Sequence, residues 1–411
     1  MRRPLRDLAD VHYGRSPNEV VHENGSIPVV GTGGVYGRAV RPLFQGPAIV
    51  VPRKGSLGNP QYISSPFWAV DTTYAVLPKK GVHARWLHYS LAHFDLTKLN
   101  EATGVPSISR DWLFKILFED PGEKAQSRIA EILSTVDEAI EQTEALIAKT
   151  QQIKAGLMHD LFTRGVTADG QLRPPREEAP QLYKESPLGW IPKGWKISNL
   201  GAEITGIDSG WSPNCENASA SFGEWAVLKT TAVVWDGYNP TENKSLSPAT
   251  AHYPRITVKP GDILITRKGP VDRVGVAVHV AATPSSLMFP DTVFRTRLLP
   301  KSEFSPVFLA FELSCRSVQK FWWARKVGLA DAQVNLNHSI LKRTPLACPD
   351  TNEQNAICAR QHEISEAISA LSMDLEKLEL VKAGLMQDLL TGRVPITLGA
   401  QPEATEVAAS V

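Results

Sequence analysis

Hydrophobic residues recur at alternating steps of four and three positions along two stretches of the chain. In the first stretch they are Ile129, Leu133, Val136, Ile140, Ile147, Leu157 and Leu161. In the second they are Ile357, Ile364, Ile368, Leu371, Leu375, Leu378, Leu385 and Leu389. Such a heptad pattern, flanked by Glu, Gln, Lys and Asp, is typical of helices that pack together as a coiled coil. It predicts two long helices, on the order of 55 Å each, whose seams bury one another.

The two predicted helices resemble one another in sequence. A shift of 228 residues lays KAGLMHDLFTRGV, at 154–166, on KAGLMQDLLTGRV, at 382–394, with nine of the thirteen positions identical. The same shift superposes residues of the helix entry: Pro121 on Pro349, Gln126 on Gln354, and Ile129 on Ile357. The prolines would block extension of each helix backwards. The chain therefore contains an internal repeat.

Four glycines mark this repeat. Gly165 and Gly392 lie where the helical pattern ends, as is usual for a helix stop. Gly156 and Gly384 lie at equivalent positions inside the helices, where glycine costs about 1 kcal/mol relative to alanine. We interpret the second pair as points of close approach between helices, and simple tolerance of glycine is the alternative.

Short hydrophobic runs separated by Gly and Pro fill the rest of the chain, and each set is followed by a helical pattern. Short motifs in the first set correspond to motifs in the second: Arg53-Lys54-Gly55 corresponds to Arg267-Lys268-Gly269, and Asp71-Thr72 corresponds to Asp291-Thr292. The pattern predicts an α+β protein with two mixed domains of one plan. The predicted parts are an N-terminal domain at 1–121, a long helix at 122–165, a linker at 166–191, a second domain at 192–349, a second long helix at 350–394, and a disordered tail at 395–411.

The linker at 166–191 is rich in Pro, Gly and charge and has little to bury, so we interpret it as a connector. Its neighbours differ in charge, although the whole chain carries a formal net charge of only +1. Residues 1–121 hold 14 Lys and Arg against 10 Asp and Glu, and 192–349 hold 18 against 12. The segments 122–191 and 350–411 hold 8 against 11 and 4 against 10. Positive charge therefore gathers in the two domains, as expected if only they meet phosphate.

Composition indicates a water-soluble protein of several domains, with 42% hydrophobic and 21% charged residues. No apolar run approaches the roughly twenty residues of a membrane span, and the start of the chain lacks the apolar core of a signal peptide. We therefore expect a cytoplasmic protein with no membrane association. The four cysteines, Cys215, Cys315, Cys348 and Cys358, lack metal-site spacing and are expected to be reduced.

Two pairs of cations are the candidate DNA contacts. Arg53 and Lys54 follow a hydrophobic run and precede a glycine, and Arg267 and Lys268 do the same. This placement would project adjacent cations from a strand end toward phosphates or base edges. A solvated turn is the alternative.

Several aromatic residues are further candidates for DNA contact. The loops Gly33-Gly34-Tyr36 and Ser209-Gly210-Trp211 bear aromatics, but ordinary turns and core aromatics are favoured there. Trp112, Trp322 and Trp323 lie in helical or strand patterns, which favours packing in the core.

Enzyme motifs are missing or incomplete. Asn59-Pro60-Gln61-Tyr62 departs from the NPPY motif of amino-methyltransferases, because glutamine replaces the second proline. The glycines of GTGGVYG at 31–37 do not fit the dinucleotide-binding spacing, and there is no GxxxxGK[ST] loop. The histidines show no pairing at metal-ligand spacing. We therefore predict no catalytic residue, no metal site and no cofactor.

The repeated order of globular block and long helix, the P…Q..I…L helix entry, the K.GLM.DL exit and WIPKGWKISNLG at 190–201 resemble the specificity subunits of Type I restriction-modification systems. The resemblance implies that each domain reads one half of a split double-stranded DNA site. It also implies that the antiparallel helix pair separates the domains and docks two methyltransferase subunits. Methylation and ATP-dependent cleavage would reside in these partners and in restriction subunits.

Two other functions stay open. One is a two-headed DNA-binding protein that works outside restriction, and the other is a coiled-coil adaptor that binds only proteins. Dependence of DNA binding on salt would separate the first from the second. The weak similarity between the two domains suggests that the two half-sites differ.

Overall fold

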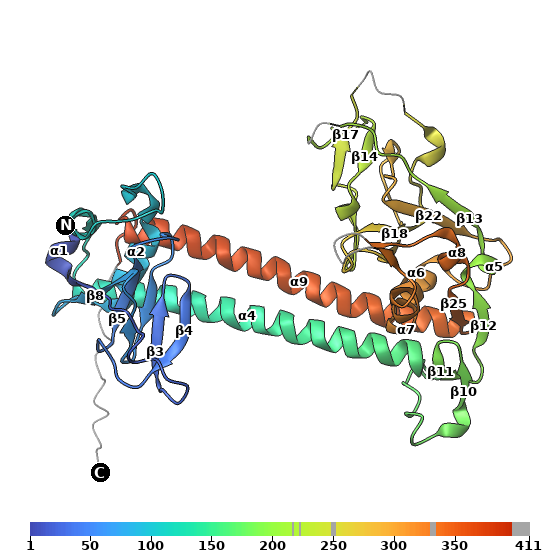
Figure 1. The fold of residues 1–411 in the computed structure, drawn as a ribbon, viewed down its shortest axis with the longest axis horizontal. Helices are drawn as coiled ribbons and strands as arrows, with labels where there is room; N and C mark the ends of the chain where they lie inside the picture. The colour runs from blue at the N-terminus through green and yellow to red at the C-terminus, as the bar shows by residue number, and fades with distance from the viewer. Residues whose placement is uncertain (216–217, 222, 248–251, 329–333, 397–411) are drawn as a thin grey trace, which may run out of the picture. The chain divides into compact units, whose positions relative to one another are not determined.

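The computed structural model describes residues 1–215, 218–221, 223–247, 252–328 and 334–396. Two compact units divide the chain, one formed by Met1–Leu146 with Leu371–Val411 and the other by Ile147–Ala370. Each unit contains a mixed domain of short strands and helices and part of each of two long helices (Figure 1). The predicted fold class is confirmed. The predicted disordered tail falls mostly at 397–411, outside the described residues.

The long helices are α4 (Glu123–Thr163) and α9 (Thr351–Leu390). Each ends just before a glycine with a left-handed backbone, Gly165 at φ +62° and Gly392 at φ +71°. Residues with a Cβ rarely adopt this conformation, which explains why both helices stop there.

The two helices run antiparallel where they meet in each unit. In the first unit, Ile129 and Leu133 share a core with Leu389, and one turn further on the Asp137 carboxylate pairs with Lys382 at 2.7 Å. In the second unit, Leu161 and Phe162 share a core with Ile357. There the backbone N–H of Val166, beyond the end of α4, donates to Glu353 Oε1 in the first turn of α9 at 2.8 Å.

All fifteen predicted seam residues are buried or half-buried. Ile129, Leu133, Leu161 and Ile357 are nearly inaccessible, whereas the residues nearer the middle of each helix keep partial exposure. Gly156 and Gly384 do not serve close approach, because no described atom lies within 4 Å of a Cβ built at either position. The alternative, simple tolerance of glycine, fits them better.

The first domain holds two main sheets and three short helices. Its antiparallel sheet has the order β2-β8-β5-β6, and its mixed sheet has the order β4-β3-β7 with β3 and β7 parallel. The strands are β1 (Arg2–Pro4), β2 (Ala9–Tyr13), β3 (Ile27–Gly31), β4 (Gly34–Ala39), β5 (Ala48–Pro52), β6 (Gln61–Ile63), β7 (Trp68–Ala69), β8 (Thr73–Pro78) and β9 (Leu117–Glu119). The helices are α1 (Leu5–Leu8), α2 (Ala84–His93) and α3 (Arg110–Lys115).

The second domain repeats this plan. Its antiparallel sheet is β13-β22-β18-β20, and its mixed sheet is β17-β14-β21 with β14 and β21 parallel. The strands are β12 (Lys196–Asn199), β13 (Ile204–Ser209), β14 (Ala226–Leu228), β17 (Asn243–Ser245), β18 (Ile263–Thr266), β20 (Ala277–His279), β21 (Leu287–Met288), β22 (Val293–Leu298) and β25 (Pro345–Cys348). The helices are α5 (Leu200–Glu203), α6 (Pro306–Ser314), α7 (Arg316–Trp323) and α8 (His338–Lys342).

Additional short strands distinguish the second domain. They form a hairpin of β15 (Val233–Val234) with β16 (Gly237–Tyr238), and a small sheet of β19 (Lys268–Gly269), β24 (Val334–Asn335) and β23 (Val327–Gly328).

The segment at 166–191 buries more than its composition suggests. Val166, Tyr183 and Ile191 are almost inaccessible, and β10 (Tyr183–Ser186) pairs with β11 (Gly189–Pro192). The guanidinium of Arg173 forms a double ion pair with Glu353, with Nη2 to Oε2 at 2.9 Å. The expectation that this segment has little to bury is therefore wrong, because its few hydrophobic residues are buried and polar contacts to α9 hold it in place.

The tryptophan predictions had mixed outcomes. Trp322 is fully buried and donates its indole N–H to Thr344 Oγ1 at 2.6 Å. Trp323, the next residue on α7, is 61% exposed, and Trp112 is 44% exposed with the Lys115 ammonium 4.3 Å from its ring. Core packing was therefore the wrong prediction for Trp112 and Trp323.

Candidate nucleic-acid interface

The predicted cation pairs occupy equivalent places in the two domains. The backbone N–H of Arg53, at the end of β5, donates to the carbonyl of Thr72 at 2.9 Å. The backbone N–H of Arg267, at the end of β18, donates to the carbonyl of Thr292 at 2.9 Å. Lys54 and Lys268 follow, and both are exposed. The same backbone hydrogen bond therefore positions each pair.

A second hydrogen bond ties each arginine to a later segment. The carbonyl of Arg53 accepts from the N–H of Ile108 at 3.0 Å, and the carbonyl of Arg267 accepts from Leu336 at 2.8 Å. The next residue in each segment, Ser109 or Asn337, caps a short helix, α3 or α8. Each helix therefore begins beside the strand-end arginine.

The first residues of these helices are Arg110 and His338, and the sequence prediction missed both. Their numbers differ by 228, which is the shift that relates the two long helices. Extending that shift backwards from Pro121 would have paired them. It would not have shown that they lie beside Arg53 and Arg267, because a different shift relates the two arginines.

An exposed tyrosine organises the cations of the first domain. The guanidinium carbons of Arg53 and Arg110 lie 5.2 and 5.3 Å from the centre of the Tyr13 ring. Tyr13 itself is 48% exposed and packs on the buried ring of Tyr74, with 5.1 Å between ring centres. Burial, followed by the neighbouring Tyr13, raises the pKa of Tyr74 to about 12, so its hydroxyl remains a hydrogen-bond donor to the carbonyl of Ile108. Two cations thus share one aromatic surface.

In the second domain the cations lie on a buried phenylalanine, Phe294, whose strand register matches that of Tyr74, and Ser209 stands where the first domain has Tyr13. The Arg267 guanidinium carbon lies 4.6 Å from the centre of the Phe294 ring, and the His338 ring centre lies 4.7 Å from it. Arg267 Nε is buried and has no hydrogen-bond partner among the described residues. Burial, and then the charges of Arg267 and Lys342, lower the pKa of His338.

Carboxylates of the described residues do not neutralise these cations. Within the described ranges, none of Arg53, Lys54, Arg110, Arg267 or Lys268 takes part in an ion pair. Among the described residues, the Arg53 side chain makes one hydrogen bond, from Nη1 to the carbonyl of Asp71 at 2.9 Å. Uncompensated cations at a strand end are suited to phosphate.

The two aromatic loops differ in exposure. Tyr36 is 62% exposed in the hairpin of β3 and β4, contrary to the expectation of a core aromatic. A cavity of about 420 Å³ lies between this hairpin and the turn at Asp71-Thr72, to which Arg53 is bonded. Trp211, by contrast, is half-buried and packs edge-on against Tyr253, with 4.9 Å between ring centres. Of the two loops, the first therefore holds the more exposed aromatic, across a cavity from the turn that is bonded to Arg53.

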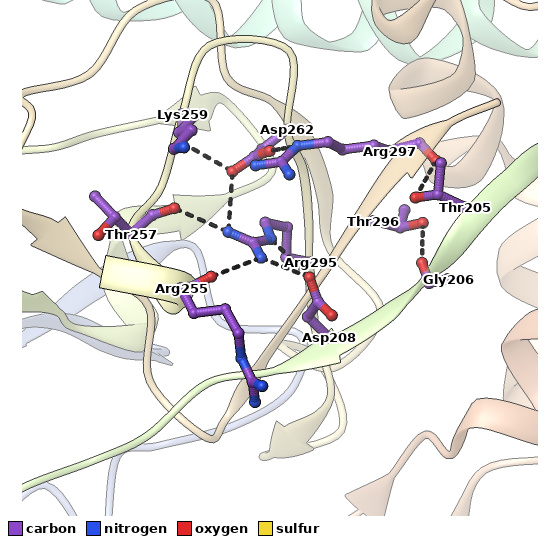
Figure 2. A network of polar contacts seen from close by, with 10 residues as sticks. All are labelled: Thr205, Gly206, Asp208, Arg255, Thr257, Lys259, Asp262, Arg295, Thr296 and Arg297. Atoms are coloured by element: carbon purple, nitrogen blue, oxygen red, sulfur yellow. Dashed lines mark hydrogen bonds and ion pairs between the residues drawn. The ribbon is translucent and has the colours of Figure 1, made fainter. Parts of the chain in front are cut away.

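An ionic network lies inside the second domain (Figure 2). The side chain of Arg295, on β22, is only 5% exposed and donates to Asp208 Oδ2 from Nη2 at 2.5 Å and to the carbonyl of Thr257 from Nη1 at 2.8 Å. The fully buried Asp262 carboxylate accepts from Arg297 Nε at 2.5 Å and lies 3.8 Å from Arg295. The strand registers place Ala75 and Ala48 of the first domain at the positions of Arg295 and Asp262. One domain therefore has ions where the other has an apolar cluster.

The described residues include no cluster of three or more His, Cys, Asp or Glu that could hold a metal ion. Among the helices they form, none has an apolar stretch of the length that a membrane span requires.

The sequence is similar to known proteins. Residues 1–152 match the family described as Type I restriction modification DNA specificity domain. The chain is 30% identical over 250 residues to the Type I restriction enzyme EcoEI specificity subunit of Escherichia coli, a match that covers 61% of this chain and 40% of that protein. It is 25% identical over 327 residues to the MjaVIII specificity subunit of Methanocaldococcus jannaschii, covering 76% and 70%.

Solved structures agree in fold. The S subunit of a Type I system from M. genitalium superposes with a TM-score of 0.59 at 15% identity, over 95% of this chain and 96% of that one. A chain from a study of Type I complex assembly superposes with a TM-score of 0.55 at 13% identity, over 96% and 98%. The predicted resemblance to Type I specificity subunits is therefore confirmed.

Proposed function

We propose that this chain is the DNA recognition subunit of a Type I restriction-modification complex, and that its two domains read the two halves of an asymmetric, split site. The observation that carries the proposal is the pair Arg53 and Arg267. Two domains of one topology hold an uncompensated arginine with the same two backbone hydrogen bonds at the same strand end. Two equivalent cationic sites in one chain fit a ligand with a repeated anionic backbone.

The surroundings of these arginines differ, which supports unlike half-sites. The first domain presents Tyr13, Tyr36 and Arg110, whereas the second presents His338 on a buried Phe294. Phosphate contacts position a protein on DNA, and contacts to base edges give specificity. Different side chains at equivalent places would therefore select different bases.

Partner docking is the second part of the proposal. A groove of about 750 Å³ in the second unit is lined by α4, α6 and α9, and its apolar wall includes Met158, Val307, Ala310 and Phe311. The long helices also expose apolar side chains: Ile153, Met373, Leu380 and Val381. Exposed apolar surface of this kind is typical of protein interfaces. We propose that two methyltransferase subunits bind the helix pair, and that restriction subunits join through the complex.

The catalytic activities would then reside in the partner subunits. Methyl transfer and ATP-dependent cleavage would be carried out by the methyltransferase and restriction subunits, and this chain would supply no catalytic group or cofactor. The complex would act in the cytoplasm, where the DNA is.

The test is to co-express the chain with its neighbouring methyltransferase and to sequence the host genome for modified bases. A split motif with a fixed gap is expected. The variants R53A/K54A and R267A/K268A should each weaken binding of a duplex that carries the motif. Each should also lower the slope of log affinity against log salt by about 0.9 for every phosphate that the variant no longer neutralises. Ala at the exposed Lys149 of α4 is the matched control.

Two outcomes favour other functions. DNA binding without any modification, despite a stable complex, would indicate a two-headed DNA-binding protein outside restriction. Failure of the complex to retain any duplex at low salt would indicate a protein-binding adaptor.

A further inference from the structure

In each domain, a second basic residue lies close to the same aromatic ring as the arginine at the strand end. Arg110 and Arg53 share the ring of Tyr13, at 5.3 and 5.2 Å. His338 and Arg267 share the ring of Phe294, at 4.7 and 4.6 Å. Both basic residues immediately follow the residue that caps a short helix, so the backbone holds them in equivalent positions.

The surroundings of the two basic residues leave their charge available. Among the residues that the structure describes, neither Arg110 nor His338 forms an ion pair with a carboxylate. An arginine side chain is always charged in proteins, whereas the imidazole of a histidine gains or loses its charge near neutrality. The two halves of the molecule therefore differ at one equivalent position in a way that pH can reveal.

We propose that Arg110 and His338 bind DNA phosphate together with Arg53 and Arg267, and that protonation of His338 makes DNA binding by the second domain, but not by the first, depend on pH. This rests on the proposed function and adds two contact residues to it. It also means that the two domains differ in whether their contact with DNA depends on pH.

The direction of the pH effect follows from the groups that face His338. These are Arg267 at the end of β18, Lys342 one turn further along α8, and the uncharged Phe294 of β22. Burial and the two cations lower the pKa of His338 in the free protein. A bound phosphate would raise it, because an opposite charge favours the charged form. Binding would therefore take up a proton, and affinity would increase as pH falls.

The experiment uses the full chain in complex with its methyltransferase. The DNA is a fluorescent duplex that carries the motif identified by genome sequencing. Affinity is measured by anisotropy between pH 5.5 and 8.5 at fixed ionic strength. The complex with the natural sequence should bind several-fold more weakly at the upper end of this range. H338R should bind tightly at all pH values, H338Q should bind weakly with little pH dependence, and R110H should show a steeper pH dependence than the natural sequence.

Matched controls come from the ends of the same two helices. Lys115 is the last residue of α3, and its ammonium lies 4.3 Å from the Trp112 ring. Arg343 caps the end of α8, and its Nε donates to the carbonyl of Ser339 at 3.3 Å. K115A and R343A should leave the pH profile unchanged.

The outcomes separate the inference from the proposed function. If H338R kept the pH profile of the natural sequence, or if H338Q bound as tightly as the natural sequence at low pH, the inference would be overturned. If R53A/K54A and R267A/K268A also bound normally, the proposed DNA interface itself would be wrong.

Discussion

Gln354 Oε1 accepts a hydrogen bond from the backbone N–H of Ser305 at 2.8 Å, and this bond fastens the first turn of α9 to the start of α6. Its amide nitrogen donates to the carbonyls of Glu303 and Pro349 at 2.9 and 3.0 Å. Gln126 makes the equivalent bond to the N–H of His83, at the start of α2, at 2.7 Å. The repeated glutamine therefore joins each long helix to the domain that precedes it.

Replacing the buried Gln354 by alanine should destabilise the protein by about 2 kcal/mol, because the N–H of Ser305 and two carbonyls lose their partner. Chemical unfolding followed by circular dichroism would measure the change. Asn355, the next residue on α9, is exposed, and N355A serves as the control. Equal free energies of unfolding for Q354A and N355A would contradict the role given to Gln354.

Glu312 should make stability depend on pH. Burial raises its pKa from 4.5 to about 8, and among the described residues only its Oε1 has a partner, the backbone N–H of Ala347 at 2.9 Å. The folded state therefore keeps a proton that the unfolded chain releases, so stability should fall as pH rises from about 4.5 to 8, by up to roughly 1.4 kcal/mol per pH unit.

E312Q should remove this dependence, because the amide is neutral at every pH and keeps the acceptor oxygen. It should be more stable than the natural sequence at pH 8, and the two should converge near pH 4.5. Urea unfolding across this range would measure both. E144Q, at an exposed site on α4, is the control, and a pH profile shared by all three proteins would refute the assignment.

Arg295 should be important for the stability of the second domain. R295A leaves the fully buried Asp262 with fewer partners and should cost about 3 to 5 kcal/mol. D208A should cost less than about 1 kcal/mol, because the Asp208 side chain is 58% exposed. The double variant D262A/R295A reproduces the alanines of the first domain and should cost less than R295A alone, since no buried charge remains. Additive effects of the two substitutions would show that charge burial is not the cause.

Val307 should affect partner docking without affecting the fold. It lies in the groove wall and is 36% exposed, so V307D places a charge on that surface without disturbing the core. The amount of methyltransferase that co-purifies should fall at least tenfold, as judged by size-exclusion chromatography with light scattering. V105D, at a position 69% exposed in the first domain, should bind the partner normally. A normal complex with V307D would place the docking surface elsewhere.

The long helices could be predicted from the sequence, because the heptad period, the prolines and the terminal glycines all act locally. The positions of Arg53 and Arg267 could be predicted because each follows a short hydrophobic strand directly. Arg110 and His338 could not be placed beside them, since that proximity depends on a segment that returns to the strand end only much later in the chain. Nor could composition show that Tyr36 is exposed while Trp211 packs on Tyr253, because that depends on how a loop folds back.

The first compact unit is built from both ends of the chain. Leu385, Leu389 and Leu390 of α9 complete a core whose other residues, such as Ile129 and Leu133, precede Leu146. The second unit consists of the single stretch Ile147–Ala370. A ribosome makes this chain from its amino end, so the residues of the second unit are all available while the first unit still waits for its last helical turns. The domain that is synthesised first is therefore the one that finishes folding last, and a ribosome stalled before residue 385 would leave its apolar surface uncovered.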